Sequence, residues 1–367
     1  MPHYYHIVEV SSAGKIFVVG DLHGAIVPFQ SVLDKLTPDD TLIITGDTID
    51  RGLNEDFRPG SPQVLDLILQ YQQAAEGTKA KIYSIRGNHE ESFLAVINLF
   101  HRMKDEPPPR QYSVKDLQQF VFFIKDGGDW IFNTDTDARQ ARVNFFQTFR
   151  HASTMKEFIP ALKKILTEMV NAPDPMTELI PNIMAYQQWI HDLPYVIKIN
   201  GERSMLVAHA DLHLSDQEID RKLAEEEEFS LQDIAHLVDA RVRDFAQPGQ
   251  RNSESRPVLV GHNIIDMPGP DVADPVRRST NHINLDAGAY FTNGFLLMNV
   301  TDNQVAIVGR NISSENLTLL QYGKNTIQEH LEHNILQQEQ EQEQEFEYEL
   351  EEEEVENETQ QKRRRVL

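Results

Sequence analysis

Short apolar runs, each bounded by Gly, Asp or His, recur along the chain. Five of them are Ile16–Val19, Leu42–Thr45, Ile82–Ile85, Met205–Ala208 and Val258–Val260. They are largely β-branched or aliphatic and too short for buried helices, so they predict central strands covered on both faces. Two later runs, Ile283–Leu285 and Phe295–Val300, predict strands of a second sheet joined through Gly288 and Gly294.

Apolar residues at helical spacing fill the intervals between these runs. The first such set lies between the first two runs and predicts a βαβ unit. Three further stripes predict a helical elaboration over about residues 91 to 188, with Pro107–Pro109 and Asp126-Gly127-Gly128 as breaks. The four sets are Phe29, Val32, Leu33 and Leu36; Phe93, Ile97 and Phe100; Leu117, Phe120, Val121 and Ile124; and Phe158, Leu162, Ile165 and Met169.

The chain changes character near its C-terminus. The stretch from Lys15 to about Gly309 has the pattern of a folded domain, whereas Gln and Glu dominate after about Leu336. Such a segment buries too little apolar surface to fold alone, so it is either disordered or a solvated helix. We therefore predict a catalytic domain over residues 1–320, followed at 321–367 by a helix and an acidic tail. The tail either keeps the protein soluble or binds a partner.

Composition excludes several classes of protein. The 367 residues include no cysteine, which excludes disulfides and thiolate metal sites and fits a reducing, cytoplasmic compartment. The net charge of −24 argues against non-specific nucleic-acid binding. No apolar run reaches the roughly 20 residues of a membrane span, and Met1–Val10 lacks the pattern of a secretory signal. Specialised export routes leave no such mark and stay open.

Each of the five predicted strands is followed at once by residues that can bind a metal. The blocks are Gly20-Asp21-Leu22-His23-Gly24, Gly46-Asp47-Thr48-Ile49-Asp50-Arg51-Gly52, Arg86-Gly87-Asn88-His89-Glu90, His209-Ala210-Asp211 and Gly261-His262-Asn263. Ligands gather at the carboxyl ends of strands in α/β sheets, so we expect these blocks to build one site. Oxygen and imidazole ligands without sulfur suit manganese, iron or zinc. One such block is more often structural, but five in order indicate a metal centre.

Taken together, the blocks resemble the phosphoprotein phosphatase family of metallophosphoesterases, in its bacterial and phage lambda-like branch. The resemblance also rests on the segments Gly127-Gly128-Asp129-Trp130-Ile131-Phe132-Asn133 and Asp286-Ala287-Gly288-Ala289. It covers about residues 14 to 300 and is interrupted between Arg139 and Tyr186, where this chain carries more helix. It implies an α/β fold, a β-sandwich of two mixed sheets flanked by helices.

The resemblance also implies a site with two divalent metal ions, manganese first and iron or zinc as alternatives. Asp21 and His23 would bind the first ion, and Asp47 would bridge to the second. Asn88, His209 and His262 would complete the second site. Such a pair clamps phosphate oxygens and lowers the pKa of a bridging water, whose hydroxide attacks phosphorus in line.

Further residues would handle the leaving group and the phosphate. We predict His89 as the general acid, oriented by Asp50; the alternative makes His89 a hydrogen-bonding support for the ligands. Arg51 would bind phosphate through a bidentate fork. A second phosphate-binding arginine is expected at Arg241 or Arg243, with Arg241 slightly favoured. Arg86 is a further candidate, either for substrate or for holding the site carboxylates.

The expected activity is hydrolysis of phosphoserine and phosphothreonine in proteins, with phosphotyrosine as a further candidate. Nucleases and phosphodiesterases with related metal sites often end in Gly-His-x-His, whereas Asn263 and Ile264 follow His262 here. Three alternatives stay open. They are a small-molecule phosphatase or dinucleoside-polyphosphate hydrolase on the same site, a non-catalytic binding module, and an active enzyme whose tail recruits a partner.

Overall fold

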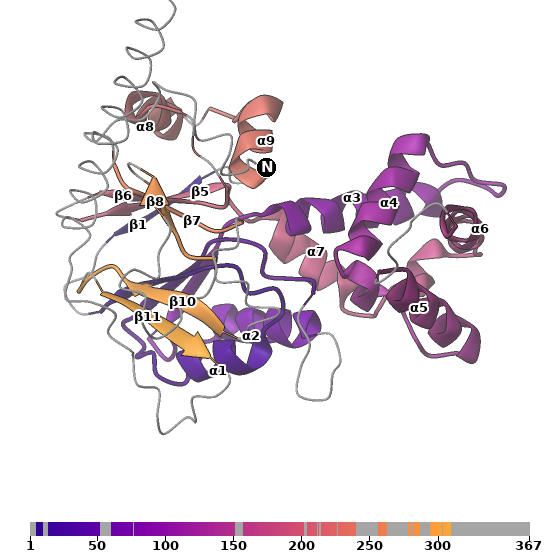
Figure 1. The fold of residues 1–367 in the computed structure, drawn as a ribbon, viewed down its shortest axis with the longest axis horizontal. Coiled ribbons are helices and arrows are strands. Elements are labelled where there is room, and N and C mark those ends of the chain that lie inside the picture. The colour runs from indigo at the N-terminus through magenta and orange to yellow at the C-terminus, as the bar shows by residue number, and fades with distance from the viewer. Residues whose placement is uncertain are drawn as a thin grey trace, which may run out of the picture.

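The structure is a computed structural model of the chain (Figure 1). It describes residues 5–9, 14–51, 60–75, 77–150, 157–201, 204–210, 212, 214–225, 227–239, 256–262, 278–279, 282–286, 294–302 and 304–309. The predicted C-terminal helix and acidic tail, and the candidate arginines Arg241 and Arg243, lie outside these described residues.

Two β-sheets form the centre of the molecule. The six-stranded sheet has the order β1-β5-β6-β7-β9-β8, and the five-stranded sheet has the order β11-β10-β2-β3-β4. Both contain parallel and antiparallel pairs, which agrees with the predicted two mixed sheets. The strands are β1 (Tyr5–Glu9), β2 (Ile16–Val19), β3 (Thr41–Ile44), β4 (Lys81–Ser84), β5 (Val196–Asn200), β6 (Met205–Ala208), β7 (Val258–Val260), β8 (Arg278–Ser279), β9 (His282–Asn284), β10 (Gly294–Asn299) and β11 (Gln304–Gly309).

Alternating side chains of the strands divide the core into layers. In β3, Ile43 packs between the two sheets, whereas Leu42 and Ile44 pack against helices on the outer face. Helices α1 (Ile26–Leu33) and α2 (Ser61–Gln73) lie on the side of the five-stranded sheet, and α8 (Asp216–Glu225) and α9 (Leu231–Asp239) lie beyond the six-stranded sheet (Figure 1). Burial on both faces explains why central strands such as β2 and β3 are almost entirely apolar instead of alternating with polar residues.

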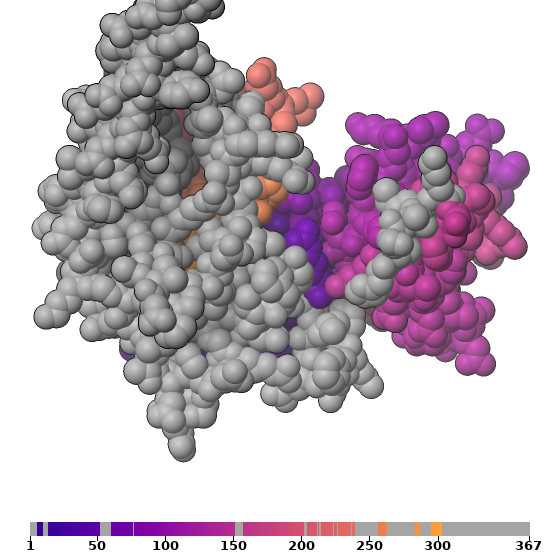
Figure 2. All heavy atoms as spheres, in the orientation of Figure 1, coloured from indigo at the N-terminus to yellow at the C-terminus, as the bar shows by residue number. Residues whose placement is uncertain are grey.

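A helical lobe projects to one side of the sandwich and meets it along one flank (Figures 1 and 2). Its elements are α3 (Asn88–Lys104), α4 (Val114–Lys125), η1 (Gly128–Ile131), α5 (Asp137–Arg150), α6 (Ile159–Val170), η2 (Pro175–Glu178) and α7 (Ile183–His191). These helices span residues 88–191, the region for which the sequence predicts a helical elaboration over about 91–188. The break predicted after α4 is confirmed, because Gly127 takes a left-handed φ of 97° beyond the helix end.

One strand prediction was wrong, and one strand was not predicted. β9 and β10 do not share a sheet, because β9 pairs with β7 in the six-stranded sheet and β10 pairs with β2 in the five-stranded one. The fold also begins before Lys15, since β1 pairs in parallel with β5. β1 lies at the edge of its sheet, where the half-exposed pattern of its residues gives little strand signal.

The lobe should depend on Arg110, whose side chain is buried at the end of α6. Its Nη1 donates to the carbonyls of Val170 at 2.7 Å and Ala172 at 2.6 Å, and its Nε donates to the carbonyl of Glu106. Arg110→Met would leave these carbonyls without their donor. We expect the free energy of unfolding to fall by about 3 kcal/mol in urea titrations.

The matched control is Arg102→Met. Arg102 is half exposed and pairs only across the surface with Asp116 at 2.8 Å, so its loss should cost less than about 1 kcal/mol. Equal losses for the two variants would show that Arg110 does not hold the lobe together.

Candidate active site

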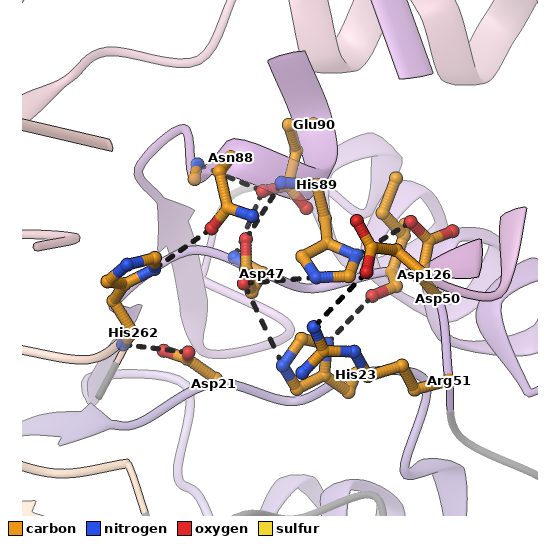
Figure 3. Close-up of polar contacts among 12 residues, drawn as sticks. Asp21, His23, Asp47, Asp50, Arg51, Asn88, His89, Glu90, Asp126 and His262 are labelled. Carbon is orange, nitrogen blue, oxygen red and sulfur yellow. Dashed lines mark hydrogen bonds and ion pairs between the residues drawn. The ribbon is translucent and has the colours of Figure 1, made fainter. Parts of the chain in front are cut away.

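The carboxyl ends of strands from both sheets meet at one place. β2, β3 and β4 belong to the five-stranded sheet and lead into Asp21, Asp47 and Asn88, while β6 and β7 belong to the other sheet and lead into His209 and His262. The two sheets contact each other here, since Nδ1 of His209 lies 2.8 Å from the carbonyl oxygen of Thr45. The predicted metal ligands are thus brought together by the junction of two sheets instead of by one sheet edge (Figure 3).

Asp47 lies at the centre of this cluster. Its Oδ2 is 3.7 Å from Nε2 of His23 and 3.7 Å from Nε2 of His89, and its Oδ1 is 3.4 Å from Nε2 of His209. Two groups of side chains have ligand atoms close enough to share a metal ion, and Asp47 belongs to both. They are His23, Asp47 and His89, and Asp47, His209 and His262. Asp47 is therefore shared by the two groups, and its role as a bridging carboxylate stays a prediction.

Hydrogen bonds to the backbone orient two of the histidines. Nδ1 of His23 faces the carbonyl oxygen of Ile49 at 3.2 Å, and Nδ1 of His209 faces that of Thr45. A carbonyl only accepts, so the proton of each neutral ring is assigned to Nδ1. The lone pair of each Nε2 then points into the cluster, which is the arrangement expected of metal-binding histidines.

The nitrogen and oxygen atoms around the second group are arranged so that they could bind a cation. Oδ1 of Asn88 lies 3.1 Å from Nε2 of His209 and 3.0 Å from Nδ1 of His262. The lone pair of His209 therefore faces an amide oxygen and a carboxylate oxygen, which are both acceptors. Converging acceptors of this kind gain stability from a divalent metal ion between them, and imidazole with oxygen donors suits manganese, iron or zinc.

Asp21 contributes buried negative charge beside this cluster. Its carboxylate accepts from the hydroxyl of Thr45 at 3.1 Å and from the backbone N–H of His262 at 2.8 Å. Burial raises its pKa well above the usual range, and the nearby charges of Asp286 and Asp47 raise it further. Asp21 belongs to neither of the two groups found among the described residues. A bound cation would offset this crowding of carboxylates.

Close approach of the backbone also shapes the site. A Cβ on Gly261 would lie 1.8 Å from Oδ1 of Asp21, and a Cβ on Gly87 would lie 2.3 Å from Oδ1 of Asp47. Glycine is therefore required at both positions, as predicted for residues that flank a metal or phosphate.

Backbone strain concentrates in the same place. Among the described residues, every non-glycine residue with positive φ belongs to the set predicted from sequence: His23 (45°), Asp47 (43°), Asp50 (70°), Arg51 (60°) and His262 (64°). Such conformations cost of order 1–3 kcal/mol each and cluster at functional sites. This observation is independent of side-chain chemistry and indicates a functional site.

Glu90 is a supporting residue to which we assigned no role from the sequence. Its buried carboxylate accepts from the backbone N–H groups of Asp47 at 3.0 Å, Thr48 at 2.8 Å and Gly87 at 2.9 Å. Burial raises its pKa to about 8, with the charge of Asp47 adding to the effect. Glu90 thereby ties the loop after β3 to the start of α3. Its position directly after His89 was the available signal.

The predicted proton donor has a buried partner. Nδ1 of His89 lies 2.7 Å from Oδ2 of Asp50, whose other oxygen accepts from the indole N–H of Trp130 at 2.6 Å. The backbone N–H of Asp50 donates to the hydroxyl of Ser61 at 2.8 Å. Nε2 of His89 is buried and makes no hydrogen bond to any described residue. The group with His23 and Asp47 also makes His89 a candidate ligand, so its geometry suits either role.

The arginines are placed differently from one another. Arg51 lies at the site, with its Nη2 3.7 Å from Oδ1 of Asp126 (Figure 3). Arg86 does not reach the site: its guanidinium contacts Glu91, Tyr195 and the carbonyls of His191 and Leu193.

The prediction that Arg86 contacts substrate or the site carboxylates was therefore wrong. Its side chain is committed to the segment between α7 and β5 instead. For Arg241 and Arg243, the prediction falls outside the described residues.

Comparison with known proteins agrees with this geometry. Residues 14–238 match the family model described as calcineurin-like phosphoesterase. The chain belongs to the calcineurin-like phosphoesterase family. The predicted metallophosphoesterase fold is confirmed, and metal-dependent hydrolysis of phosphoesters follows from the family.

Comparisons with curated proteins and solved structures add little about the substrate of this phosphoesterase. No curated protein matches the chain. One solved structure, described as "Crystal structure of a putative diadenosine tetraphosphatase", is 16% identical with a TM-score of 0.43, over 83% of this chain and 99% of that chain. A likeness at that level does not define a substrate. No helix in the described part of the phosphoesterase is long and apolar enough to span a membrane.

Metal binding should depend on the space beside Asp47. In Gly87→Ala the new Cβ would press on Oδ1 and on the backbone nitrogen of Asp47, at 2.3 and 2.7 Å. Asp47 would have to move, and we expect Mn²⁺ affinity measured by calorimetry to fall by about tenfold or more.

The control is Gly77→Ala, which strains a residue with φ of 75° but whose new Cβ meets no atom of the described residues within 4 Å. Unchanged affinity in that variant separates a local effect from general destabilisation. Unchanged affinity in Gly87→Ala would show that Asp47 does not hold the ion.

Stability should depend on pH through His89. Burial lowers the pKa of His89, but the charge of Asp47 and the hydrogen bond to Asp50 outweigh it and raise the pKa to about 9. The folded protein then holds this proton more tightly than the unfolded chain does. The contribution is fully present below about pH 6.5 and is lost as the pH rises to about 9.

Chelator-treated wild type should therefore lose about 3 kcal/mol more unfolding free energy over this interval than His89→Asn does. Urea titrations at several pH values measure the difference. Parallel pH curves for the two proteins would contradict the assignment.

Proposed function

We propose that this phosphoesterase is a phosphoprotein phosphatase acting on phosphoserine and phosphothreonine, with phosphotyrosine as a further substrate. The observation that carries the proposal is the buried pair of His89 and Asp50, 2.7 Å apart. The alkoxide that leaves from a serine or threonine ester is strongly basic and needs a proton at departure. A protonated imidazole supported by a carboxylate supplies one.

The other side chains take the remaining roles. Asp21, His23, Asp47, Asn88, His209 and His262 hold two divalent ions, for which we propose Mn²⁺ before iron or zinc. Bound ions of this kind supply Lewis acidity toward phosphate oxygens and lower the pKa of water. Arg51 binds the phosphate. When substrate arrives, Arg51 leaves its ion pair with Asp126, and both arms of the guanidinium are then available to the phosphate oxygens.

Asp126 then acts as a resting partner that keeps Arg51 beside the site. Both side chains are partly exposed, so the pair is weak enough to exchange for a phosphate dianion. The C-terminal tail, with its alternating Gln and Glu, is proposed as a separate partner-binding segment of a cytoplasmic enzyme.

Hydrolysis assays with metal-stripped protein test the function. p-Nitrophenyl phosphate, a phosphothreonine peptide and diadenosine tetraphosphate would each be incubated with and without Mn²⁺, beside Asp47→Asn. We expect metal-dependent turnover of the first two substrates, a loss of about 100-fold or more in the variant, and little turnover of the dinucleotide.

The other outcomes distinguish the rivals. Turnover of the dinucleotide in preference to the peptide would replace the proposal by a dinucleoside-polyphosphate hydrolase. Turnover of the small ester alone would indicate a small-molecule phosphatase. A folded protein with no turnover under any metal would indicate a binding module.

A further inference from the structure

The carboxylate of Asp50 is held by side chains from two different elements, α3 and η1. It is completely buried, and each oxygen has its own partner: Oδ2 faces Nδ1 of His89, and Oδ1 accepts from Nε1 of Trp130 at 2.6 Å. His89 comes from the start of α3 at the site. Trp130 comes from η1 in the helical lobe. Trp130 therefore reaches the predicted proton donor through the carboxylate of Asp50.

The indole of Trp130 has little freedom to move. It is 6% exposed and stacks on Phe93 of α3 with ring centroids 5.8 Å apart and planes 7° apart. On another side lies Tyr186 of α7, at 6.2 Å, whose hydroxyl donates to Asp66 of α2 at 2.7 Å. Two helices, α3 and α7, thus fix the direction of the indole N–H, and α2 holds Tyr186 in place.

The lobe also holds the residue that follows Asp50. Nη2 of Arg150, at the end of α5, donates to the carbonyl of Arg51 at 3.1 Å. A Cβ on Gly127 would lie 2.7 Å from the backbone nitrogen of Arg51, so the chain approaches closely there. Asp50 and Arg51 both have left-handed φ values, and such strain persists only when surrounding contacts enforce it. η1 and α5 provide those contacts.

We propose that Trp130 is a positioning residue for proton transfer to the leaving group. Its N–H fixes the Asp50 carboxylate in the rotation at which Oδ2 holds Nδ1 of His89, so that Nε2 of His89 faces the reacting ester. The inference rests on the proposed role of His89 as the proton donor. It assigns part of the catalytic geometry to the helical lobe.

The physical reason lies in the freedom of a carboxylate. Its terminal torsion is broad and roughly two-fold, so one hydrogen bond alone does not fix it. Removal of the indole N–H would leave Oδ1 of Asp50 buried without its partner, which is costly. The carboxylate would then turn to find another donor, and His89 would lose its fixed direction.

Trp130→Phe tests the proposal because it removes the N–H and keeps an aromatic ring. Its matched control is Trp189→Phe in α7, the same change at a tryptophan of the same lobe. Trp189 is 7% exposed, and its Nε1 makes no hydrogen bond within the described part of the chain. The substrates are phenyl phosphate and p-nitrophenyl phosphate, which differ by one nitro group. The nitrophenolate leaves readily without a proton, whereas the phenolate needs one.

We expect kcat for phenyl phosphate to fall about tenfold in Trp130→Phe, with p-nitrophenyl phosphate changed less than about twofold. Trp189→Phe should leave kcat for both esters at the wild-type value. Mn²⁺ affinity, measured by calorimetry, should stay at the wild-type value in both variants. In the Asp50→Asn background, adding Trp130→Phe should cause no further selective loss, because Trp130 acts through Asp50.

Two results would overturn the inference in different ways. In the first result, His89→Asn lowers kcat for phenyl phosphate selectively, but Trp130→Phe behaves like Trp189→Phe. His89 is then the proton donor, and Trp130 does not position it. In the second result, His89→Asn lowers kcat for both esters equally. His89 is then not the proton donor, and both the inference and that part of the proposed function are wrong.

Discussion

The structure depends on a concentration of negative charge where two sheets meet. Asp21 and Asp47 are buried at the carboxyl ends of β2 and β3, and burial disfavours their charged forms. For Asp47, four histidines outweigh that effect and lower the pKa, with His209 contributing most. Glycines bring the backbone close, and Glu90 ties the neighbouring loops together. The surrounding fold is the framework that keeps these acidic groups together.

Much of this arrangement could be predicted from the sequence, because strand ends carry short, ordered signals. Asp21 and Asp47 each follow an apolar run closely, and the parallel strands β2 and β3 deliver them to a common edge. His209 also follows an apolar run, but its strand, β6, belongs to the other sheet. The helical stripe from Phe93 also gives a regular pattern, which explains why α3 was predicted well. Local spacing was sufficient in these cases.

Long-range contacts could not be predicted in the same way. β9 and β10 read alike as apolar runs, and nothing in their residues tells which sheet each joins. Arg86 follows a strand directly, as a site residue would, yet its guanidinium turns toward Tyr195, 109 positions later in the chain. The hydrogen bond from Trp130 to Asp50 spans 80 positions. The packing of the lobe determines such long-range partners, and short sequence motifs carry no information about that packing.

Helix α3 begins at the site and runs into the lobe. Asn88 is its first residue, and the helix extends through Lys104, a length of roughly 25 Å at 1.5 Å per residue. Along its length the helix packs against α4 and η2 of the lobe. Because a helix resists compression and bending, it acts as a stiff shaft between the metal ligands and a distant surface. A protein that bound the lobe beside α3 would be coupled through this helix to the reaction centre without entering it.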